Sequence, residues 1–64
     1  MKTEIWFGLT KLCHYFTTNV PRVGDTIWLV NSGEKRKIVA VEWAVYVVDG
    51  TDKAQGEDVR VFVE

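Results

Sequence analysis

The segment from Lys35 to Val48 constrains the fold most, because it alternates like a strand and is apolar on both faces. One face would carry Val39, Val41, Trp43, Val45 and Val47. The other would carry Ile38, Ala40, Ala44, Tyr46 and Val48, interrupted only by Glu42. An antiparallel strand with one face in water is polar on that face. We therefore expect this strand to be covered on both sides.

The length of this segment adds a second constraint. Fourteen extended residues at about 3.3 Å each span roughly 46 Å, whereas a compact chain of 64 residues has a diameter of roughly 28 Å. The strand must therefore bend sharply, with a bulge, or project into a partner. A strand that bends from one half-sheet into the other can close a small barrel. The fold class that we expect is all-β, a small, partly open barrel of about five antiparallel strands.

The other strands are predicted from short runs of β-branched and aromatic residues. They cover residues Thr3–Leu9, Leu12–Thr17, Thr26–Val30 and Asp58–Val63. In the first of them Ile5, Phe7 and Leu9 alternate and suit the core face. A connector with Pro21, a hairpin turn at Asn31–Glu34 and a polar loop at Asp49–Glu57 separate the strands. A helix over Leu9–Thr17 is the alternative for that segment, although its residue types favour a strand.

The chain forms one domain, residues 1–64, near the lower size limit for independent folding. Cys13 is the only cysteine, so a disulfide within the chain is impossible, and Cys13 with His14 is too small a set for a zinc site. Small domains without a disulfide or a structural metal often associate with copies of themselves, and we expect a homo-oligomer. The interface would use the apolar side chains left outside the barrel, which are Trp6, Trp28, Tyr46 and Phe62. Alternatively, some of these side chains complete the core.

The residues that catalysis needs are missing. Cys13 and His14 are neighbours on a predicted strand, so their side chains point to opposite faces and cannot form a dyad. We expect Cys13 to be a small buried hydrophobic residue. The acidic stretch Asp49–Asp52 lacks the ligand spacing of an EF-hand, and no glycine-rich phosphate loop is present. The sequence predicts a protein that is not an enzyme, has no catalytic residue, holds no metal and uses no cofactor.

Binding chemistry is easier to place. Lys35, Arg36 and Lys37 form a basic run after the predicted hairpin, and positive charge beside aromatic rings suits a ligand with a phosphate and a base. The candidate ligand-binding residues are Arg22, Trp28, Arg36, Lys37 and Tyr46. The alternative is a hairpin whose lysines only keep a sheet edge soluble. A net charge of −1 and a pI of about 5.7 disfavour a nucleic-acid partner. No stretch is long enough to span a membrane, and we expect no membrane partner.

The run Val20-Pro21-Arg22-Val23-Gly24-Asp25 leads into a predicted strand, and Val39 with Val41-Glu42-Trp43 follows later. This pattern, with the alternating end Val59–Glu64, resembles short proteins encoded by bacteriophages and other mobile elements. The resemblance implies a barrel of the Src-homology-3-like kind and brings no agreed activity. It carries over no binding residues, because the matched positions serve turns and packing.

The resemblance also implies a biological setting. Many short phage proteins block host defences, so we expect a self-associating binding module in the host cytoplasm. It would sequester a small phosphorylated, nucleotide-type signal or cover a host protein. Two alternatives stay open, a small barrel that binds single-stranded nucleic acid and a structural or assembly protein of a virion.

Overall fold

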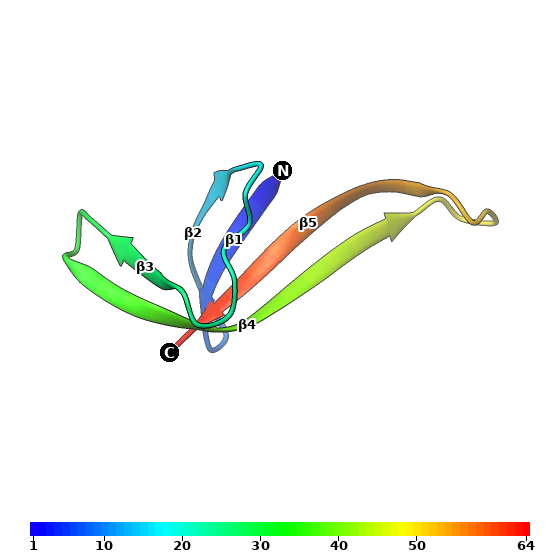
Figure 1. Ribbon diagram of the computed structural model, residues 1–64. Helices are drawn as coiled ribbons and strands as arrows, with labels where there is room; N and C mark the ends of the chain where they lie inside the picture. Colours follow the sequence, from blue (N-terminus) through cyan, green and yellow to red (C-terminus); the bar gives the residue numbers. More distant parts are fainter.

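The structure, a computed structural model, describes residues 1–64 and contains five strands. They are β1 (Lys2–Phe7), β2 (Thr10–Phe16), β3 (Thr26–Leu29), β4 (Glu34–Val47) and β5 (Ala54–Val63). The strands form one curled sheet in the order β2-β1-β5-β4-β3, so the first and last strands are neighbours in its centre, with the two termini at opposite ends of this pair (Figure 1). The expected all-β fold and the small, partly open barrel are confirmed. One detail differs, because β1 and β5 pair in parallel while the other neighbours are antiparallel.

The first hairpin confirms a strand, not a helix, after residue 9. The turn at Gly8 has a φ of 60°, a conformation that glycine adopts without strain. It ends β1 at Phe7, earlier than the expected end at Leu9, and Leu9 is 98% exposed at the tip. Leu9 is therefore not the core residue that its place in the alternation suggested.

The last strand begins at Ala54 instead of Asp58. The residues Ala54–Glu57, expected in a loop, pair with the end of β4 around Val45 and Val47. This pairing follows from the length of β4, because its apolar end needs a hydrogen-bonding neighbour. Gln55 has no partner in the register and forms a bulge opposite the Tyr46–Val47 step.

β4 contains the expected bulge, at Val39. Ile38 lies opposite Val63 and Ala40 opposite Phe62, so Val39 is the extra residue. The bulge changes the assignment of faces that simple alternation predicts, because one inserted residue exchanges the faces of the residues that follow it. Ile38 consequently shares the concave face of the sheet with Val41 and does not lie on the opposite face.

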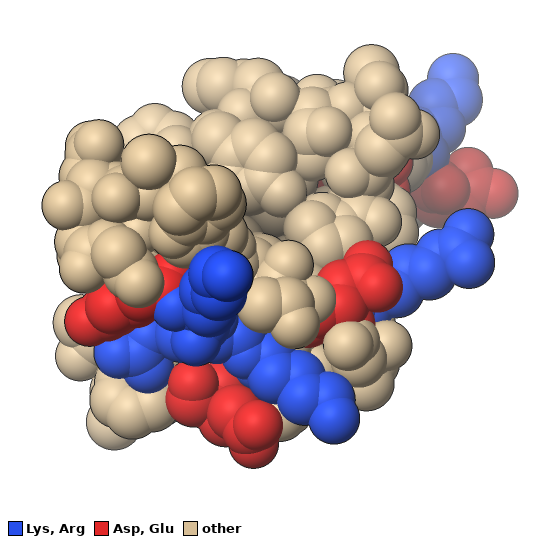
Figure 2. Space-filling model, turned by 60° about the vertical axis from the view of Figure 1, so that its left-hand side comes forward, with Lys and Arg blue, Asp and Glu red and all other residues tan.

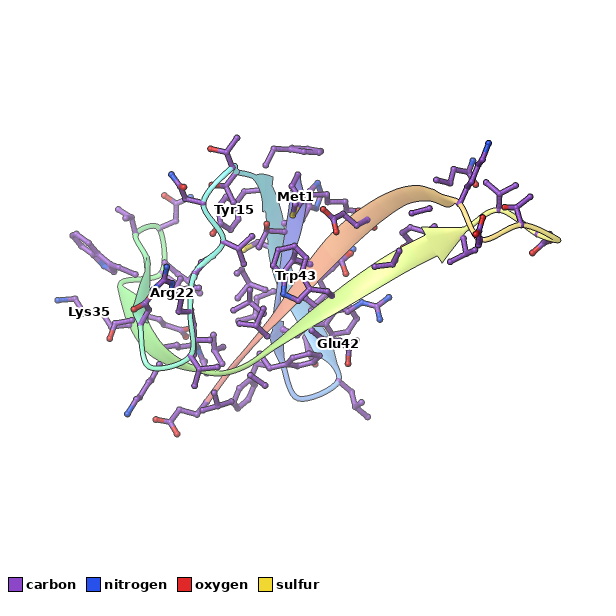
Figure 3. The ribbon with its side chains drawn as sticks, turned by 45° about the vertical axis from the view of Figure 1, so that its right-hand side comes forward. Met1, Tyr15, Arg22, Lys35, Glu42 and Trp43 are labelled. Carbon is purple, nitrogen blue, oxygen red and sulfur yellow. The ribbon has the colours of Figure 1, made fainter.

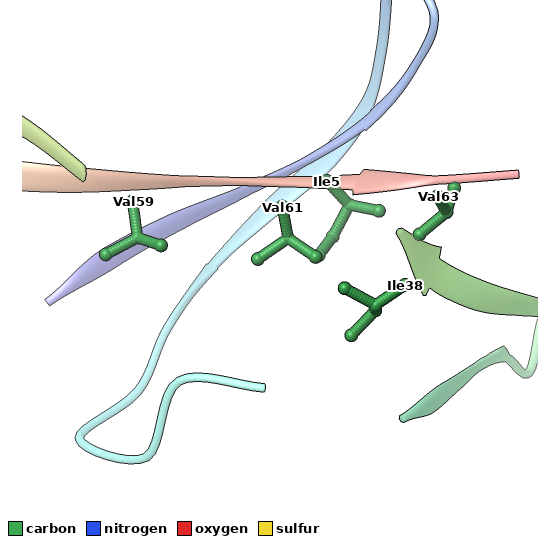
Figure 4. Packing of buried hydrophobic residues seen from close by; sticks show 5 residues of the cluster. All are labelled: Ile5, Ile38, Val59, Val61 and Val63. Atoms are coloured by element: carbon green, nitrogen blue, oxygen red, sulfur yellow. The ribbon is translucent and has the colours of Figure 1, made fainter. Parts of the chain in front are cut away.

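The core lies on this concave face. Five buried side chains form it, and they lie on one side of β5 (Figure 4): Ile5, Ile38, Val59, Val61 and Val63. Leu12, Val20, Ile27 and Val41 pack against them. Phe7, which the alternation placed in the core, is 47% exposed, and the Arg36 guanidinium carbon lies 4.5 Å from its ring centroid. The core is small for a chain of this length.

The ends of β4 and β5 continue beyond the half-barrel as a two-stranded projection (Figure 1). We call residues Trp43–Glu57 the arm. The molecule measures 45 × 19 × 19 Å and has a radius of gyration of 13.3 Å, compared with about 10.7 Å for a compact chain of this length. Its accessible surface is 4768 Å², whereas a compact protein of this mass exposes roughly 4,200 Å². β4 therefore both bends and projects.

Candidate binding surfaces

The concave face continues along the arm as an apolar strip. Trp43 lies opposite Val59, Val45 opposite Glu57 and Val47 opposite Ala54, so the three β4 side chains share one face. Trp43, Val45 and Val47 are 50%, 53% and 55% exposed. Figure 3 shows Trp43 inside the curl of the sheet, on the same side as Tyr15. We call Trp43, Val45 and Val47 the inner strip.

The opposite face of the arm is also partly apolar. Tyr46 and Val48 are half exposed there. The Tyr46 hydroxyl donates a hydrogen bond to Asp58 Oδ2 at 3.0 Å, and this bond, with the charge of Asp58, raises the pKa of Tyr46. The bond ties the Tyr46 hydroxyl to β5, and the side chain is still 49% exposed. Neither face of the arm is covered within one copy of the chain.

An open groove lies between the connector and the base of the arm. Val20, Pro21, Arg22 and Val23 form one wall and Val41 and Trp43 the other, around a volume of about 320 Å³. The backbone N–H of Arg22 donates to Asp25 Oδ2 at 3.0 Å, which holds the connector in place. The Arg22 side chain makes no ion pair. A free guanidinium and a half-exposed indole ring therefore line the same groove.

A second groove marks the seam where the barrel stays open, between β2 and β3. Leu12 and Cys13 line one side and Trp28–Ser32 the other, around about 450 Å³. Lys35 Nζ lies 5.4 Å from the centroid of the Trp28 ring, within the range of a cation–π contact. Cys13 is exposed at this seam. The thiol is accessible, contrary to the buried small hydrophobe that the sequence suggested.

A charged network crosses the outer face of the sheet, and its centre is Glu4. The Glu4 Oε1 atom accepts hydrogen bonds from Trp6 Nε1 at 3.2 Å and from Arg60 Nε at 3.3 Å. Its Oε2 lies 3.7 Å from Lys2 Nζ and 3.5 Å from Lys11 Nζ. Glu4 is only 8% exposed. Burial raises the pKa of Glu4, but these donors and cations outweigh burial, and the pKa lies below its ordinary value.

Sequence reasoning missed this network, although a weak signal was present. Lys2, Glu4 and Trp6 alternate along β1 and therefore share its outer face. The partner Arg60 is at the other end of the chain, and only the pairing of β1 with β5 brings it close. The network serves the sheet and does not form a ligand site, because its charges are already paired.

The structure does not bring the five predicted ligand-binding residues into one site. Arg36 Nε lies 2.9 Å from Glu34 Oε2, and Arg36 Nη1 donates to the Glu64 carbonyl oxygen at 3.3 Å. Lys37 is the next residue on the strand and points to the opposite face. Tyr46 lies on the arm, about ten residues or roughly 30 Å along the strand from Arg36. On the face that Figure 2 shows, basic and acidic side chains are interspersed, without a large patch of one sign.

The four predicted interface residues also lie in different places. Trp6 and Phe62 are opposite each other on the outer face and half-buried, with Leu9 beside them around a shallow groove. Trp28 is exposed at the seam and Tyr46 on the arm. The sequence did not single out the inner strip as a surface, although all three of its residues belong to the long apolar segment.

Comparisons with known proteins found no match: no family model matches the sequence, and neither a curated protein nor a solved structure is similar to the chain. The structure contains no helix that is long and apolar enough to cross a membrane. No group of three or more His, Cys, Asp or Glu side chains is placed to hold a metal ion.

Proposed function

We propose that the chain is a non-enzymatic, self-associating binding module that acts by covering a protein surface. The arm is the observation that supports this function. It carries apolar side chains on two faces that the rest of the chain leaves open, and contiguous exposed apolar surface marks interaction sites. Aromatic residues are the side chains most enriched among strong interface contacts, and the arm presents Trp43 and Tyr46.

The setting proposed for this module is the one that the resemblance implies. The protein would be encoded by a phage or another mobile element and would act in the host cytoplasm, where covering a host protein blocks a defence system. A non-enzymatic blocker must act stoichiometrically, and an oligomer presents several copies of the same surface. Protection of the phage should therefore scale with the amount of the protein.

A charge placed on the inner strip tests this function. Val47→Lys puts an ammonium at the outer end of the strip, while Gln55→Lys adds the same charge at the bulge on the neighbouring strand and serves as the matched control. Each variant is expressed in bacteria that carry defined defence systems, and phage plaques are counted. We expect wild-type chain and Gln55→Lys to raise plaque counts in at least one such strain, and Val47→Lys to lose this effect. Equal protection by both variants would contradict the role of the arm.

A second candidate function is the capture of a small phosphorylated, nucleotide-type ligand. The groove with Arg22 and Trp43 favours it, because a guanidinium can bind a phosphate in a bidentate manner and an indole can stack on a base. Titration with adenosine monophosphate and with cyclic dinucleotides, followed by tryptophan fluorescence, tests this candidate. We expect Arg22→Gln to weaken binding at least tenfold and Lys53→Gln, on the arm loop, to leave it unchanged.

The remaining alternatives give different results in simple measurements. A barrel that binds single-stranded nucleic acid would bind an oligonucleotide with an affinity that falls steeply as salt rises. A virion component would be found in purified particles, with its apolar arm buried there. A defence inhibitor would act in the host cell and be absent from the particle.

A further inference from the structure

One edge of β4 has no neighbour over most of its length. β3 pairs only with the first part of β4, Glu34–Lys37. At the next residue, the Ile38 N–H donates to the Asp25 carbonyl at 2.9 Å, and the Ile38 carbonyl accepts from the Gly24 N–H at 3.0 Å. Beyond Ile38, no strand pairs with this side of β4. We call the stretch Trp43–Val47 on this side the free edge.

The direction of the backbone groups on the free edge follows from the hydrogen bonds at its ends. The Val48 N–H points toward β5, because it donates to the Lys53 carbonyl at 2.9 Å. Successive residues of a strand direct their N–H and C=O groups to alternate sides. Trp43, Val45 and Val47 therefore direct theirs away from β5. These groups belong to the residues whose side chains form the inner strip.

The free edge lacks the features that protect the other open edges of the sheet. β2 carries Lys11 and His14, β3 is only 4 residues long, and the β5 side of the arm has the Gln55 bulge and Glu57. Charges, short length and bulges each discourage pairing with another chain. From Trp43 to Val47 the free edge has no charge, no proline and no bulge. It is a template for an added strand.

We propose that the free edges of two copies pair antiparallel about a two-fold axis at Val45. Val45 then lies opposite Val45 of the second copy, Trp43 opposite Val47, and Ala44 opposite Tyr46. On one face of the joined sheet Trp43 lies beside the smaller Val47. On the other face Tyr46 lies beside the smaller Ala44. The backbone N–H and C=O groups of Trp43, Val45 and Val47 in the two copies would form about six hydrogen bonds between the chains. Glu42 stays outside the paired stretch.

Three observations favour a second copy as the occupant of this edge. An antiparallel pairing centred on one residue is self-complementary, which is the requirement of a two-fold interface. The net charge of −1 opposes association only weakly. The surface exposed beyond that of a compact chain, roughly 600 Å², approaches the roughly 800 Å² that each partner buries in a stable complex. This inference rests on the self-association included in the proposed function and names the element that performs it.

Backbone chemistry tests the proposal, because a chain of this length is accessible to synthesis. N-methylation of Val45 removes only the N–H on the free edge and puts a methyl group there. The control is N-methylation of Asp52 in the loop of the arm, whose N–H makes no backbone hydrogen bond. Analytical ultracentrifugation gives the dissociation constant of each dimer. We expect the constant of the Val45 derivative to rise at least tenfold and that of the Asp52 derivative to stay within twofold of the wild type.

Two results would overturn the proposal in distinguishable ways. If the Val45 derivative dimerises as tightly as the wild type, the pairing of the free edges is ruled out. Self-association would then use another surface. If the wild-type chain stays monomeric at a high concentration, about 100 µM, self-association itself is ruled out.

A second measurement covers the case in which the methylated chain does not fold. In a Cys13→Ser background, single cysteines are introduced as Val45→Cys, Val39→Cys and Asp52→Cys and treated with a short bismaleimide. Cross-linking should be fastest at position 45, which lies on the axis. A maximum at position 39 or 52, or equal rates at all three, would contradict the axis at Val45.

Discussion

Arg60 Nε lies 3.3 Å from Glu4 Oε1, and this contact joins residues separated by 56 positions in the sequence. The two residues lie directly opposite each other on the parallel strands β1 and β5. On its other side Arg60 faces Glu42, with Nη1 3.3 Å from Oε1. One cation therefore separates two acids across three neighbouring strands. Opposite charges in register support a pairing, and like charges in register oppose it, so this row favours the observed order of β1, β5 and β4.

Glu4→Gln tests the contribution of this row through its pH dependence. Because the pKa of Glu4 is lowered in the fold, its carboxylate stabilises the folded chain above the unfolded pKa, near 4.3. That contribution is lost as the pH falls through the folded pKa. We expect Glu4→Gln to lower the free energy of unfolding at pH 7 by about 1 to 3 kcal/mol. At pH 3 the difference from the wild type should be smaller.

Urea unfolding at both pH values measures this effect. Glu57→Gln is the control, because Glu57 is exposed on the arm and makes no ion pair. A wild-type chain and a Glu4→Gln variant that lose stability in parallel between pH 7 and pH 3 would show that the row contributes nothing to folding.

Deletion of Val39 tests the bulge that bends β4. Without the extra residue, Ile38 and Val41 stand two positions apart, so β4 keeps its pairing with β5 and Trp43 stays on the concave face. The deletion removes only the bend that a bulge gives to a strand, and with it the path that brings Ile27 of β3 against the core. We expect the variant to lose about 0.5 to 3 kcal/mol of stability in urea unfolding. Deletion of Asp52, in the loop where no ladder pair depends on it, should have a smaller effect, and a Val39 deletion as stable as the wild type would contradict a role for the bend.

The sequence predicts much of the fold, because most strands are defined by local signals. The turn residues and the alternating runs locate all five strands, with ends displaced by up to four residues. The bulge in β4 also follows, because fourteen extended residues do not fit a small domain. These predictions depend only on residues close together in the chain.

The binding surfaces are less predictable, because they depend on pairing between distant segments. Nothing local indicates that β1 pairs with β5 in parallel, and so the place of Arg60 beside Glu4 cannot be predicted. The basic run around Arg36 suggests a ligand site, but Glu34 and the Glu64 carbonyl already occupy that guanidinium. The length of the arm depends on where β5 begins, and the polar residues before Asp58 indicate a loop instead.

Ile38→Ala tests how strongly the stability of the half-barrel depends on its small core. Ile38 is fully buried, and removing its outer methyl and methylene groups from a core is expected to cost about 2 to 5 kcal/mol. With only five buried apolar side chains, this loss should unfold much of the population at 25 °C. Ile38→Val, which keeps most of the volume, should cost about 0.5 to 1.5 kcal/mol. Thermal unfolding followed by circular dichroism measures both, and Val45→Ala on the exposed arm, studied at concentrations where the chain is monomeric, should have a smaller effect than Ile38→Ala.

Gly24→Ala tests the turn that leads from the connector into β3. Gly24 has a φ of 95°, and its N–H donates to the Ile38 carbonyl at 3.0 Å. A Cβ at this position would meet no atom within 4 Å, so the cost of alanine arises from the backbone conformation alone. We expect a loss of about 1 to 3 kcal/mol, measured by urea unfolding.

Two controls separate this conformational cost from a general effect of alanine. Gly56→Ala also places its Cβ in open space, but Gly56 has no positive φ, and we expect it to be neutral or to stabilise the chain by about 0.4 to 1 kcal/mol. A synthetic chain with D-alanine at position 24 should be at least as stable as the wild type, because a D-residue favours positive φ. If D-alanine and L-alanine at this position destabilise the chain equally, the conformation of Gly24 is not what the turn requires.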